Sequence, residues 1–235
     1  MTIGPCDALF LGPHPDDVEI AASGTILRLL AAGHRVAIVD ATAGEKGSRG
    51  DEATRRKEAT AAQAALGVEQ RHNLGLPDAG VVADDTTVEL LVAALRQARP
   101  QLFFAPAERD VHPDHVAVAK AAGRAFFLAG LSKFAPELGE AHRPRVCVRY
   151  PGNQPTEVSF AVDISDLAEH KSRVLRCYQS QLAPPDRSHL YLGLDILERA
   201  QLRDQFYGSQ IGCRAAEPFL VDGPLPLRDL APLMV

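Results

Sequence analysis

The stretch DALFLGPHPDDVEIAASGTILRLLAAG, residues 7–33, decides the fold. It starts with an apolar run, turns through two prolines, a histidine and two aspartates, and then carries apolar side chains at helical spacing up to Gly33. A glycine is typical of the residue just after a helix. A short apolar strand, a polar turn and a helix in this order form the repeating unit of a parallel sheet covered by helices.

The same unit recurs through the first half of the chain. Each apolar run is followed by a helical pattern, and Asp51 and Gly67 suit the two ends of one of these helices. We therefore predict an α/β fold, Rossmann-like, with an open, mainly parallel sheet and helices on both faces. The predicted strands are residues 7–12, 35–42, 71–76 and 102–106, and the predicted helices are 18–33, 51–67, 86–100 and 115–130.

The second half of the chain is less regular and contains proline-rich loops. It has no repeat and no obvious linker, so we predict one domain over residues 1–235. Its parts are a Rossmann-like core (1–130) and a C-terminal elaboration (131–235). In the elaboration, strands are predicted at 143–150 and 158–165, and helices at 166–181 and 194–209.

Composition excludes several classes of protein. A formal net charge of −5 without a basic stripe, and only 6% aromatic residues, argue against nucleic-acid binding. No apolar run reaches the roughly 18 residues of a membrane-spanning helix, and no secretory signal pattern opens the chain. The four cysteines are scattered, as in cytosolic proteins with free thiols, so we expect a cytoplasmic protein.

The tripeptide His-Pro-Asp occurs twice, each time after a predicted strand. The two copies are HPDD at 14–17 and HPDH at 112–115. In the strand order 3-2-1-4, strands 1 and 4 are neighbours and their loops diverge, which is where such sheets bind ligands. We therefore expect the two polar loops to face each other across one crevice. The first turn lacks the glycines of a dinucleotide fingerprint, which disfavours nucleotide binding there.

Imidazole and carboxylate groups gathered in one place are ligands for zinc or another divalent metal. A catalytic zinc ion takes three protein ligands and leaves a position for water, whose pKa it lowers to about 7. Asp16 and Asp17 are adjacent and cannot easily aim at one point, so one is expected to bind metal and the other to act as general base. A remaining histidine would stabilise the oxyanion or protonate the leaving group. Spacing alone leaves open which residue has which role.

Five motifs give the chain a family resemblance. It resembles the LmbE-like (PIG-L type) zinc-dependent deacetylases of N-acetylglucosamine derivatives. Within them it is most similar to the branch that deacetylates N-acetylglucosaminyl malate in bacillithiol biosynthesis, on the stretches HKSRVLRCYQSQ, YGSQIGCRAAEPF and GPLPLRDL. The family motifs are HPDD (14–17), GEKGSRG (44–50), RKEA (56–59), LGLPD (74–78) and RDVHPDH (109–115).

The resemblance implies a role for each residue of the two polar loops. Asp16 becomes the general base, His112 stabilises the oxyanion, and Asp114 orients an imidazole. The implied metal is Zn²⁺, one per chain, although Fe²⁺ or Mn²⁺ also suits such ligands. The implied zinc ligands are His14, Asp17 and His115.

The resemblance also implies a substrate pocket and an assembly. The substrate is a small N-acetyl sugar conjugate, and the expected assembly is a homo-oligomer, commonly a hexamer. Guanidinium groups suit a dicarboxylate such as malate. Two departures from the family pattern are Pro13 before the first histidine and the loop at 149–158, which matches only loosely. The implied substrate-binding residues are Arg49, Asp78 and Arg109.

Simpler interpretations stand beside these. Asp16 or Asp17 would cap the helix after the first motif, and Asp114 the helix after the second. The glycine-rich loop 44–50 is either a flexible loop or a substrate lid. Arg49 would otherwise serve a subunit contact, Asp78 a turn, and Arg109 an ion pair with Asp110. The alternatives in function are a deacetylase or amidase of a mycothiol-type or chitin-derived conjugate, or a metal- or sugar-binding module without turnover.

Overall fold

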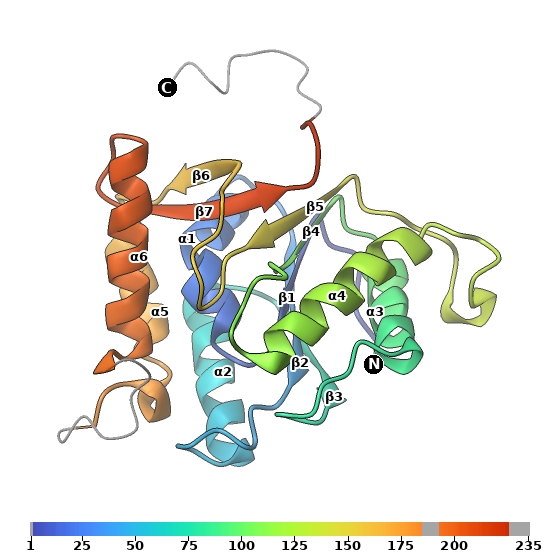
Figure 1. The fold of residues 1–235 in the computed structure, drawn as a ribbon, viewed down its shortest axis with the longest axis horizontal. Coiled ribbons are helices and arrows are strands. Elements are labelled where there is room, and N and C mark those ends of the chain that lie inside the picture. The colour runs from blue at the N-terminus through green and yellow to red at the C-terminus, as the bar shows by residue number, and fades with distance from the viewer. Residues whose placement is uncertain (1, 185–192, 226–235) are drawn as a thin grey trace.

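A computed structural model describes residues 2–184 and 193–225. Its sheet has seven strands in the order β3-β2-β1-β4-β5-β7-β6 (Figure 1). Strands β1 to β5 are parallel, while β7 runs antiparallel to both of its neighbours. The predicted order 3-2-1-4 is thus confirmed. The strands are β1 (Ala8–Gly12), β2 (Val36–Thr42), β3 (Gln70–Leu76), β4 (Leu102–Pro106), β5 (Val146–Tyr150), β6 (Phe160–Asp163) and β7 (Ala216–Val221).

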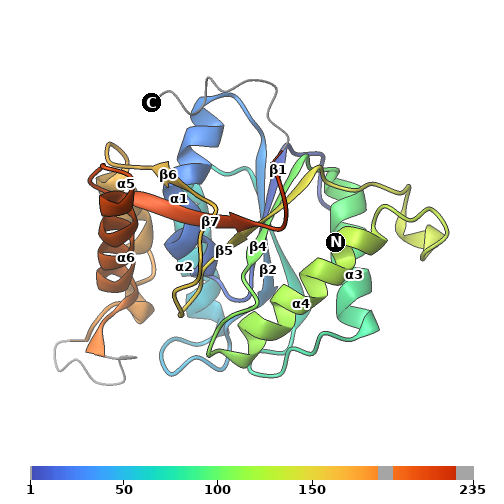
Figure 2. The same ribbon diagram turned by 45° about the horizontal axis from the view of Figure 1, so that its top comes forward.

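Helices cover both faces of the sheet, as the α/β prediction requires. Six α-helices and two short 3-10 turns are present in the described residues, and α3 and α4 lie on the face opposite α1, α2 and α5 (Figures 1 and 2). The helices are α1 (Asp17–Ala31), α2 (Glu52–Leu66), α3 (Asp85–Ala98), α4 (Pro113–Leu128), α5 (Ala168–Leu175) and α6 (Ile196–Gln210).

Strand β1 explains why the sheet needs two layers of helices. All five of its residues are buried. Leu9 and Leu11 belong to the core under α3 and α4, while Ala8 and Phe10 belong to the core on the other side. Phe10 stacks on Phe104 of β4, with ring centroids 4.1 Å apart. An apolar strand buried on both faces is typical of the centre of a parallel sheet.

The predicted helix ends of the first half are confirmed. The carboxylate of Asp51 accepts the Thr54 N–H at the start of α2, and Gly67 ends that helix with φ 76°. Gly33, with φ 82°, follows the end of α1. A left-handed backbone at these positions is easiest for glycine, so these residues stop the helices where the sequence indicates.

Two predictions for the second half were inaccurate. The helix expected over 166–181 ends at Leu175 and is followed by a separate 3-10 turn, Gln179–Gln181. Strand β7 was not predicted, although it joins β5 to β6 and extends the sheet. Part of the GPLPLRDL stretch (226–230) lies outside the described residues. The division of the chain into domains stays a prediction.

A buried network of charges fixes the C-terminal helices against α1. The Lys171 ammonium lies 2.8 Å from the Glu217 carboxylate and 2.7 Å from that of Asp204. Glu217 is fully buried and also accepts the backbone N–H groups of Gly24 and Thr25 in α1. Because unpaired buried charges are costly, these groups hold α5, α6, β7 and α1 in one arrangement. None of the described helices combines the length and the apolar character needed to cross a membrane.

Candidate metal centre and active site

The two His-Pro-Asp loops meet, as the strand order predicts. The first follows β1 and leads into α1, and the second follows β4 and leads into α4. The ring centroids of His14 and His115 are 5.4 Å apart, and His112 lies 4.8 Å from each of them. Three imidazoles from loops about a hundred residues apart in sequence therefore share one small volume at the carboxyl ends of neighbouring strands.

His14, Asp17 and His115 form a ligand set for a divalent cation. Asp17 Oδ2 lies 3.1 Å from His14 Nδ1 and 3.2 Å from His115 Nε2. The donor atoms of all three residues lie within 4.8 Å of one another. Atoms about 2.0–2.2 Å from a tetrahedral zinc ion are roughly 3.3–3.6 Å apart, so only a small adjustment would let the three share one ion.

The electric field at this site favours positive charge. Burial alone would lower the pKa of His14, but the carboxylates of Asp17 and Asp78 outweigh it and raise that pKa to about 11. Burial would also lower the pKa of His115, but the carboxylates of Asp17 and Asp110 outweigh it and raise that pKa to about 9. Despite its burial, Asp17 has a pKa well below the usual range because of the two imidazoles. A divalent cation at this point would supply the positive charge that these carboxylates favour.

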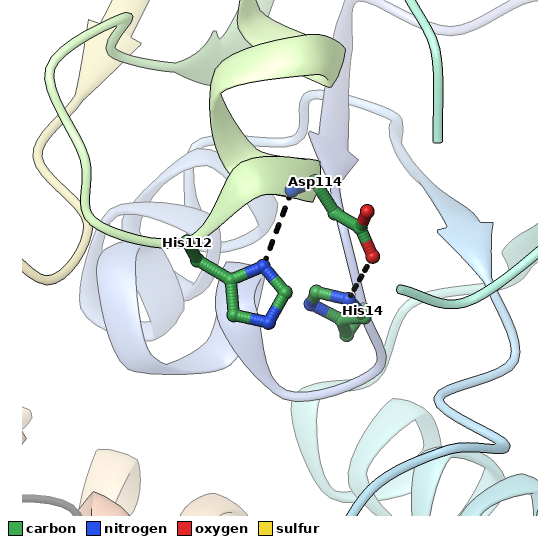
Figure 3. Close-up of side chains that lie close together, drawn as sticks. All are labelled: His14, His112 and Asp114. Atoms are coloured by element: carbon green, nitrogen blue, oxygen red, sulfur yellow. Dashed lines mark hydrogen bonds and ion pairs between the residues drawn. The ribbon is translucent and has the colours of Figure 1, made fainter. Parts of the chain in front are cut away.

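A second group of three residues shares His14 (Figure 3). Asp114 Oδ2 lies 3.2 Å from His14 Nε2, and His112 Nδ1 accepts the backbone N–H of Asp114. The Asp114 carboxylate also accepts the N–H groups of Ala79 and Val81. Since these side chains are already bonded to protein, the group is better suited to orienting His14 than to binding a second ion.

His112, and not Asp114, is the N-cap of α4, so the capping alternative for Asp114 is wrong. The Asp114 N–H is bonded to Nδ1 of His112, which places the ring proton of a neutral imidazole on Nε2. Burial first, then His115 and His14, lower the pKa of His112. In its neutral form His112 can therefore donate a hydrogen bond only through Nε2.

Asp16 stands apart from the ligand set. It occupies the N-cap position of α1 with φ 114°, and its side chain caps nothing. Its carboxylate instead accepts a hydrogen bond from Arg55 Nη2 at 3.2 Å. Burial raises the pKa of Asp16 to about 6, with Arg55 opposing the rise. A strained backbone of this kind costs on the order of 1–3 kcal/mol and is frequent at active sites.

Arg55 is a residue of the site that the sequence did not reveal, although it immediately precedes the RKEA motif. It donates to the Pro15 carbonyl as well as to Asp16. Its Nε and Nη1 are buried without a hydrogen-bond partner among the described residues. Buried donors without hydrogen-bond partners are uncommon in proteins, and here the guanidinium carbon lies 5.8 Å from the centre of the Tyr178 ring, within reach of a cation–π contact.

Asp110 is the other residue that the sequence analysis missed, having been weighed only as a partner of Arg109. Its Oδ2 lies 3.0 Å from His115 Nδ1, and it accepts the backbone N–H of Asn153 and, at Oδ1, that residue's Nδ2. The Arg109–Asp110 pair therefore does not form, and Arg109 is exposed. Asp110 fixes the ring of His115 in the manner common for metal-binding histidines.

Gly152 lets the loop after β5 pack onto this pair. A Cβ atom there would lie 2.0 Å from Asp110 Oδ2 and 3.1 Å from His115 Nδ1. The first separation is too short for any side chain while Asp110 keeps its position, and the second is tight. The loop that departs from the family pattern thus touches the metal site directly.

The proposed substrate-binding residues lie in three different settings. Asp78 is buried, 3.1 Å from His14 Nε2, and accepts the backbone N–H of Lys46 in the glycine-rich loop. Arg49, in the same loop, donates to the Leu182 carbonyl. Asp78 therefore adjoins the ligand set, whereas Arg49 binds the chain's own C-terminal part and Arg109 is exposed to solvent.

A match to a family model covers residues 9–126 of the chain. The model describes PIG-L, GlcNAc-PI de-N-acetylase. The matched segment contains both His-Pro-Asp loops and amounts to half of the 235 residues. This match shows to which family the chain belongs.

Three similar proteins with curated names are deacetylases. A diacetylchitobiose deacetylase of Thermococcus kodakarensis is 29% identical over 89% of this chain and 80% of its own length. A 1D-myo-inositol 2-acetamido-2-deoxy-alpha-D-glucopyranoside deacetylase of Saccharomonospora viridis is 30% identical over 74% of this chain and 84% of its own length. A probable N-acetyl-alpha-D-glucosaminyl L-malate deacetylase 2 of Bacillus cereus is 29% identical over 74% of this chain and 82% of its own length.

Solved structures share the fold over nearly the whole chain. The conserved protein TT1542 of Thermus thermophilus is 36% identical, with a TM-score of 0.84, over 96% of this chain and 98% of its own. The N,N'-diacetylchitobiose deacetylase of Pyrococcus horikoshii is 27% identical, with a TM-score of 0.81, over 95% of this chain and 88% of its own. The 4-carboxy-2-hydroxymuconate hydratase GalB of Pseudomonas putida, 22% identical with a TM-score of 0.77 over 96% and 99%, shares the fold alone. The chain belongs to the PIG-L family and is a hydrolytic N-deacetylase.

Proposed function

We propose that this chain is a metal-dependent hydrolase that removes the acetyl group from an N-acetylglucosamine conjugate in the cytoplasm. The observation that carries the proposal is the approach of His14, Asp17 and His115 to one another. Beside them stands the carboxylate of Asp16, which belongs to neither of the two possible ligand sets in the described part of the chain. Two imidazoles and a carboxylate leave at least one coordination position open, as a catalytic centre requires.

His14 Nδ1, Asp17 Oδ2 and His115 Nε2 would hold the cation. When bound, a divalent cation lowers the pKa of a water molecule and polarises the amide carbonyl. Zinc is the proposed metal, and Fe²⁺ or Mn²⁺ would also accept these ligands. Asp78 and Asp114 orient His14, and Asp110 orients His115, so both rings are fixed before a cation arrives.

Asp16 is the proposed general base. Its carboxylate removes a proton from the attacking water and later delivers a proton to the departing amine. Arg55 holds the carboxylate by one nitrogen, and the Asp16 side chain makes no capping bond to the helix that it precedes. Because burial brings the pKa of Asp16 close to neutrality, the group can both take up and release a proton near pH 7.

His112 is the proposed donor to the oxyanion. Its Nδ1 is occupied by the Asp114 N–H, so in a neutral imidazole the opposite nitrogen carries the proton. A preorganised donor of this kind typically contributes about 10²–10³-fold to the rate. Asp114 contributes through the orientation of His14 and through its backbone N–H.

The aglycone is proposed to be malate, as in bacillithiol biosynthesis. The relative from Bacillus cereus supports this choice, whereas the relatives from Thermococcus kodakarensis and Saccharomonospora viridis are named for chitobiose and inositol conjugates. Arg49, Asp78 and Arg109 are kept as proposed substrate contacts, and Asp78 lies beside the ligand set, 3.1 Å from His14 Nε2. We also propose that the enzyme works as a homo-oligomer.

The test is acetate release from a panel of conjugates. Four substrates would be compared under one set of conditions, with and without a chelator. They are N-acetylglucosaminyl malate, the conjugate of N-acetylglucosamine with myo-inositol, diacetylchitobiose and the methyl glycoside of N-acetylglucosamine. We expect acetate release that the chelator stops and that added zinc restores. The malate conjugate is expected to have the highest kcat/KM. A protein that binds zinc stoichiometrically but releases no acetate from any conjugate would instead be a binding module.

A further inference from the structure

The loop after β5 reaches the metal ligands, although it matches the family pattern only loosely. A cavity of about 340 Å³ lies between this loop and α6, and its lining includes Asp17 and His115 as well as Asn153. No side chain of the loop belongs to either of the possible ligand sets in the described residues. The contacts of Asn153 indicate what the loop does for the metal site.

Both oxygens of the Asp110 carboxylate are held by Asn153. The backbone N–H of Asn153 donates to Oδ2 at 2.8 Å, and its side-chain Nδ2 donates to Oδ1 at 3.0 Å. Oδ1 also accepts the His112 N–H, and Oδ2 lies 3.0 Å from Nδ1 of His115. A carboxylate has about four acceptor sites, so these four contacts leave it little freedom to turn. Since the Asp110 side chain is only 1% exposed, water has little room to replace a lost partner.

A bond on the opposite side fixes the orientation of the Asn153 amide. Its Oδ1 accepts a hydrogen bond from Arg199 Nη2 at 2.6 Å. Because a guanidinium can only donate, this contact identifies the accepting atom as the amide oxygen, so the NH₂ group faces Asp110. The amide is thus held between α6 and the carboxylate, in the orientation that donates to Asp110.

Two neighbours of Asn153 hold the loop in the position that these bonds need. The Tyr150 hydroxyl donates to the Leu11 carbonyl of β1 at 2.6 Å. Gly152 lies so close to Asp110 that a Cβ atom there would be 2.0 Å from Oδ2. The loop is therefore bonded to the strand that precedes the first His-Pro-Asp motif and packed against the loop that carries the second.

We propose that Asn153 is a positioning residue for the metal site. It holds the Asp110 carboxylate where it binds Nδ1–H of His115, which leaves Nε2 of that ring free for the cation. The inference rests on the proposed metal-dependent deacetylation and adds a residue that acts through two others. If the carboxylate could turn, the His115 ring would lose its fixed orientation, so loss of the Asn153 side chain would weaken metal binding without removing a ligand.

The test measures the zinc affinity of the full chain by competition with a chelator. In Asn153→Ala, the Kd for zinc is expected to rise about tenfold, the lower end of the effect of an outer partner, because the backbone N–H of residue 153 remains. Asn153→Asp places a second carboxylate against Asp110 and should raise the Kd at least as much. This variant keeps the shape of the amide, so it carries the test if the alanine variant does not fold.

The matched control is Gln154→Ala. It removes the neighbouring amide side chain, which lines the same cavity but is not a partner of Asp110 in the described residues. The Kd for zinc should stay unchanged in this variant. Thermal unfolding of each metal-free protein shows that the compared variants are folded.

A double-mutant cycle shows whether Asn153 acts through Asp110. In the background of Asp110→Ala there is no carboxylate to hold, so adding Asn153→Ala should change the Kd by less than about twofold. A residue that merely supports the fold would instead lower the affinity by the same factor in both backgrounds.

Two results would overturn the inference. One is an unchanged Kd in both Asn153→Ala and Asn153→Asp. The other is an equal rise of the Kd from Asn153→Ala with and without Asp110, which would mean that the residue acts by another route. An unaltered chain that binds no zinc would contradict the proposed metal centre, and the inference would fail with it. Normal zinc binding that neither variant changes would contradict the inference alone, so the two failures are distinguishable.

Discussion

The two His-Pro-Asp loops have the same tripeptide but different backbones. Helix α1 starts three residues after His14, at Asp17, whereas α4 starts directly after His112, at Pro113. Since each helical residue turns the chain by about 100°, an offset of two residues points equivalent side chains in different directions. Asp16 thus lies outside its helix and faces Arg55, while Asp114 lies within its helix and faces His14. The motif brings the groups together, and the register of the following helix assigns their roles.

The largest expected effect comes from removing one imidazole from either loop. His14→Ala and His115→Ala should each lose nearly all bound metal and all measurable acetate release, because both loops contribute to one ion. Metal content by elemental analysis and acetate release are the measurements, with His34→Ala, at an exposed position, as the control. Retention of stoichiometric metal by His115→Ala would show that the second loop is not part of the ligand set.

The variant Asp16→Asn tests whether the two aspartates of the first loop have different roles. The amide cannot accept the proton, so kcat should fall by about 10²–10⁴-fold while the bound metal stays at one ion per chain. Steady-state kinetics with metal analysis of the same sample tests both parts. Near-normal turnover would remove Asp16 from the mechanism.

Asp110→Asn and Gly152→Ala should weaken metal binding through His115, in the second loop. The first change removes the charge that orients the ring, and the second pushes the carboxylate away from it. Loss of such an outer partner typically costs about 10–100-fold in metal affinity. Competition with a chelator of known affinity measures it. Gly4→Ala controls for the mutation type, since Gly4 lacks a left-handed backbone and an added carbon there would meet only the end of the Gln70 side chain. Unchanged affinity in both variants would show that Asp110 does not support His115.

The smallest effect expected is a difference in stability between two substitutions of His112. Both His112→Ala and His112→Asn remove the proposed oxyanion donor and should lower kcat similarly. Only alanine also removes the cap of α4, because asparagine is a favourable N-cap residue, so the alanine variant should be less stable by about 1 kcal/mol. Chemical denaturation compares the two. Equal stability would mean that the bond from Asp114 N–H to His112 contributes little to the helix.

The sequence predicted the parallel core and the meeting of the two loops because these depend on local patterns. The continuous apolar run of β1 and helix-ending glycines such as Gly67 are readable from neighbouring residues. The polar partners were not readable in this way. Asn153 lies 43 residues from Asp110, and Glu217 lies 192 residues from Thr25, so no spacing links them.

Strand β7 was missed for a related reason. Its sequence, AEPFLV, contains a glutamate and a proline, which are uncommon in strands. Glu217 is tolerated there because Lys171 and the backbone of Gly24, in the middle of α1, supply its partners. Strand propensity is decided by such surroundings as much as by the strand's own residues.

Gly152 has a practical consequence for anyone who wishes to retarget this enzyme. The loop after β5 is the natural segment to randomise, since it forms one side of the cavity. A library that varies position 152 would mostly return inactive clones, as every added carbon collides with Asp110. Diversity placed at Gln154 and Pro155, with that glycine and Asn153 held constant, would explore new sugar conjugates without disturbing the proposed metal site.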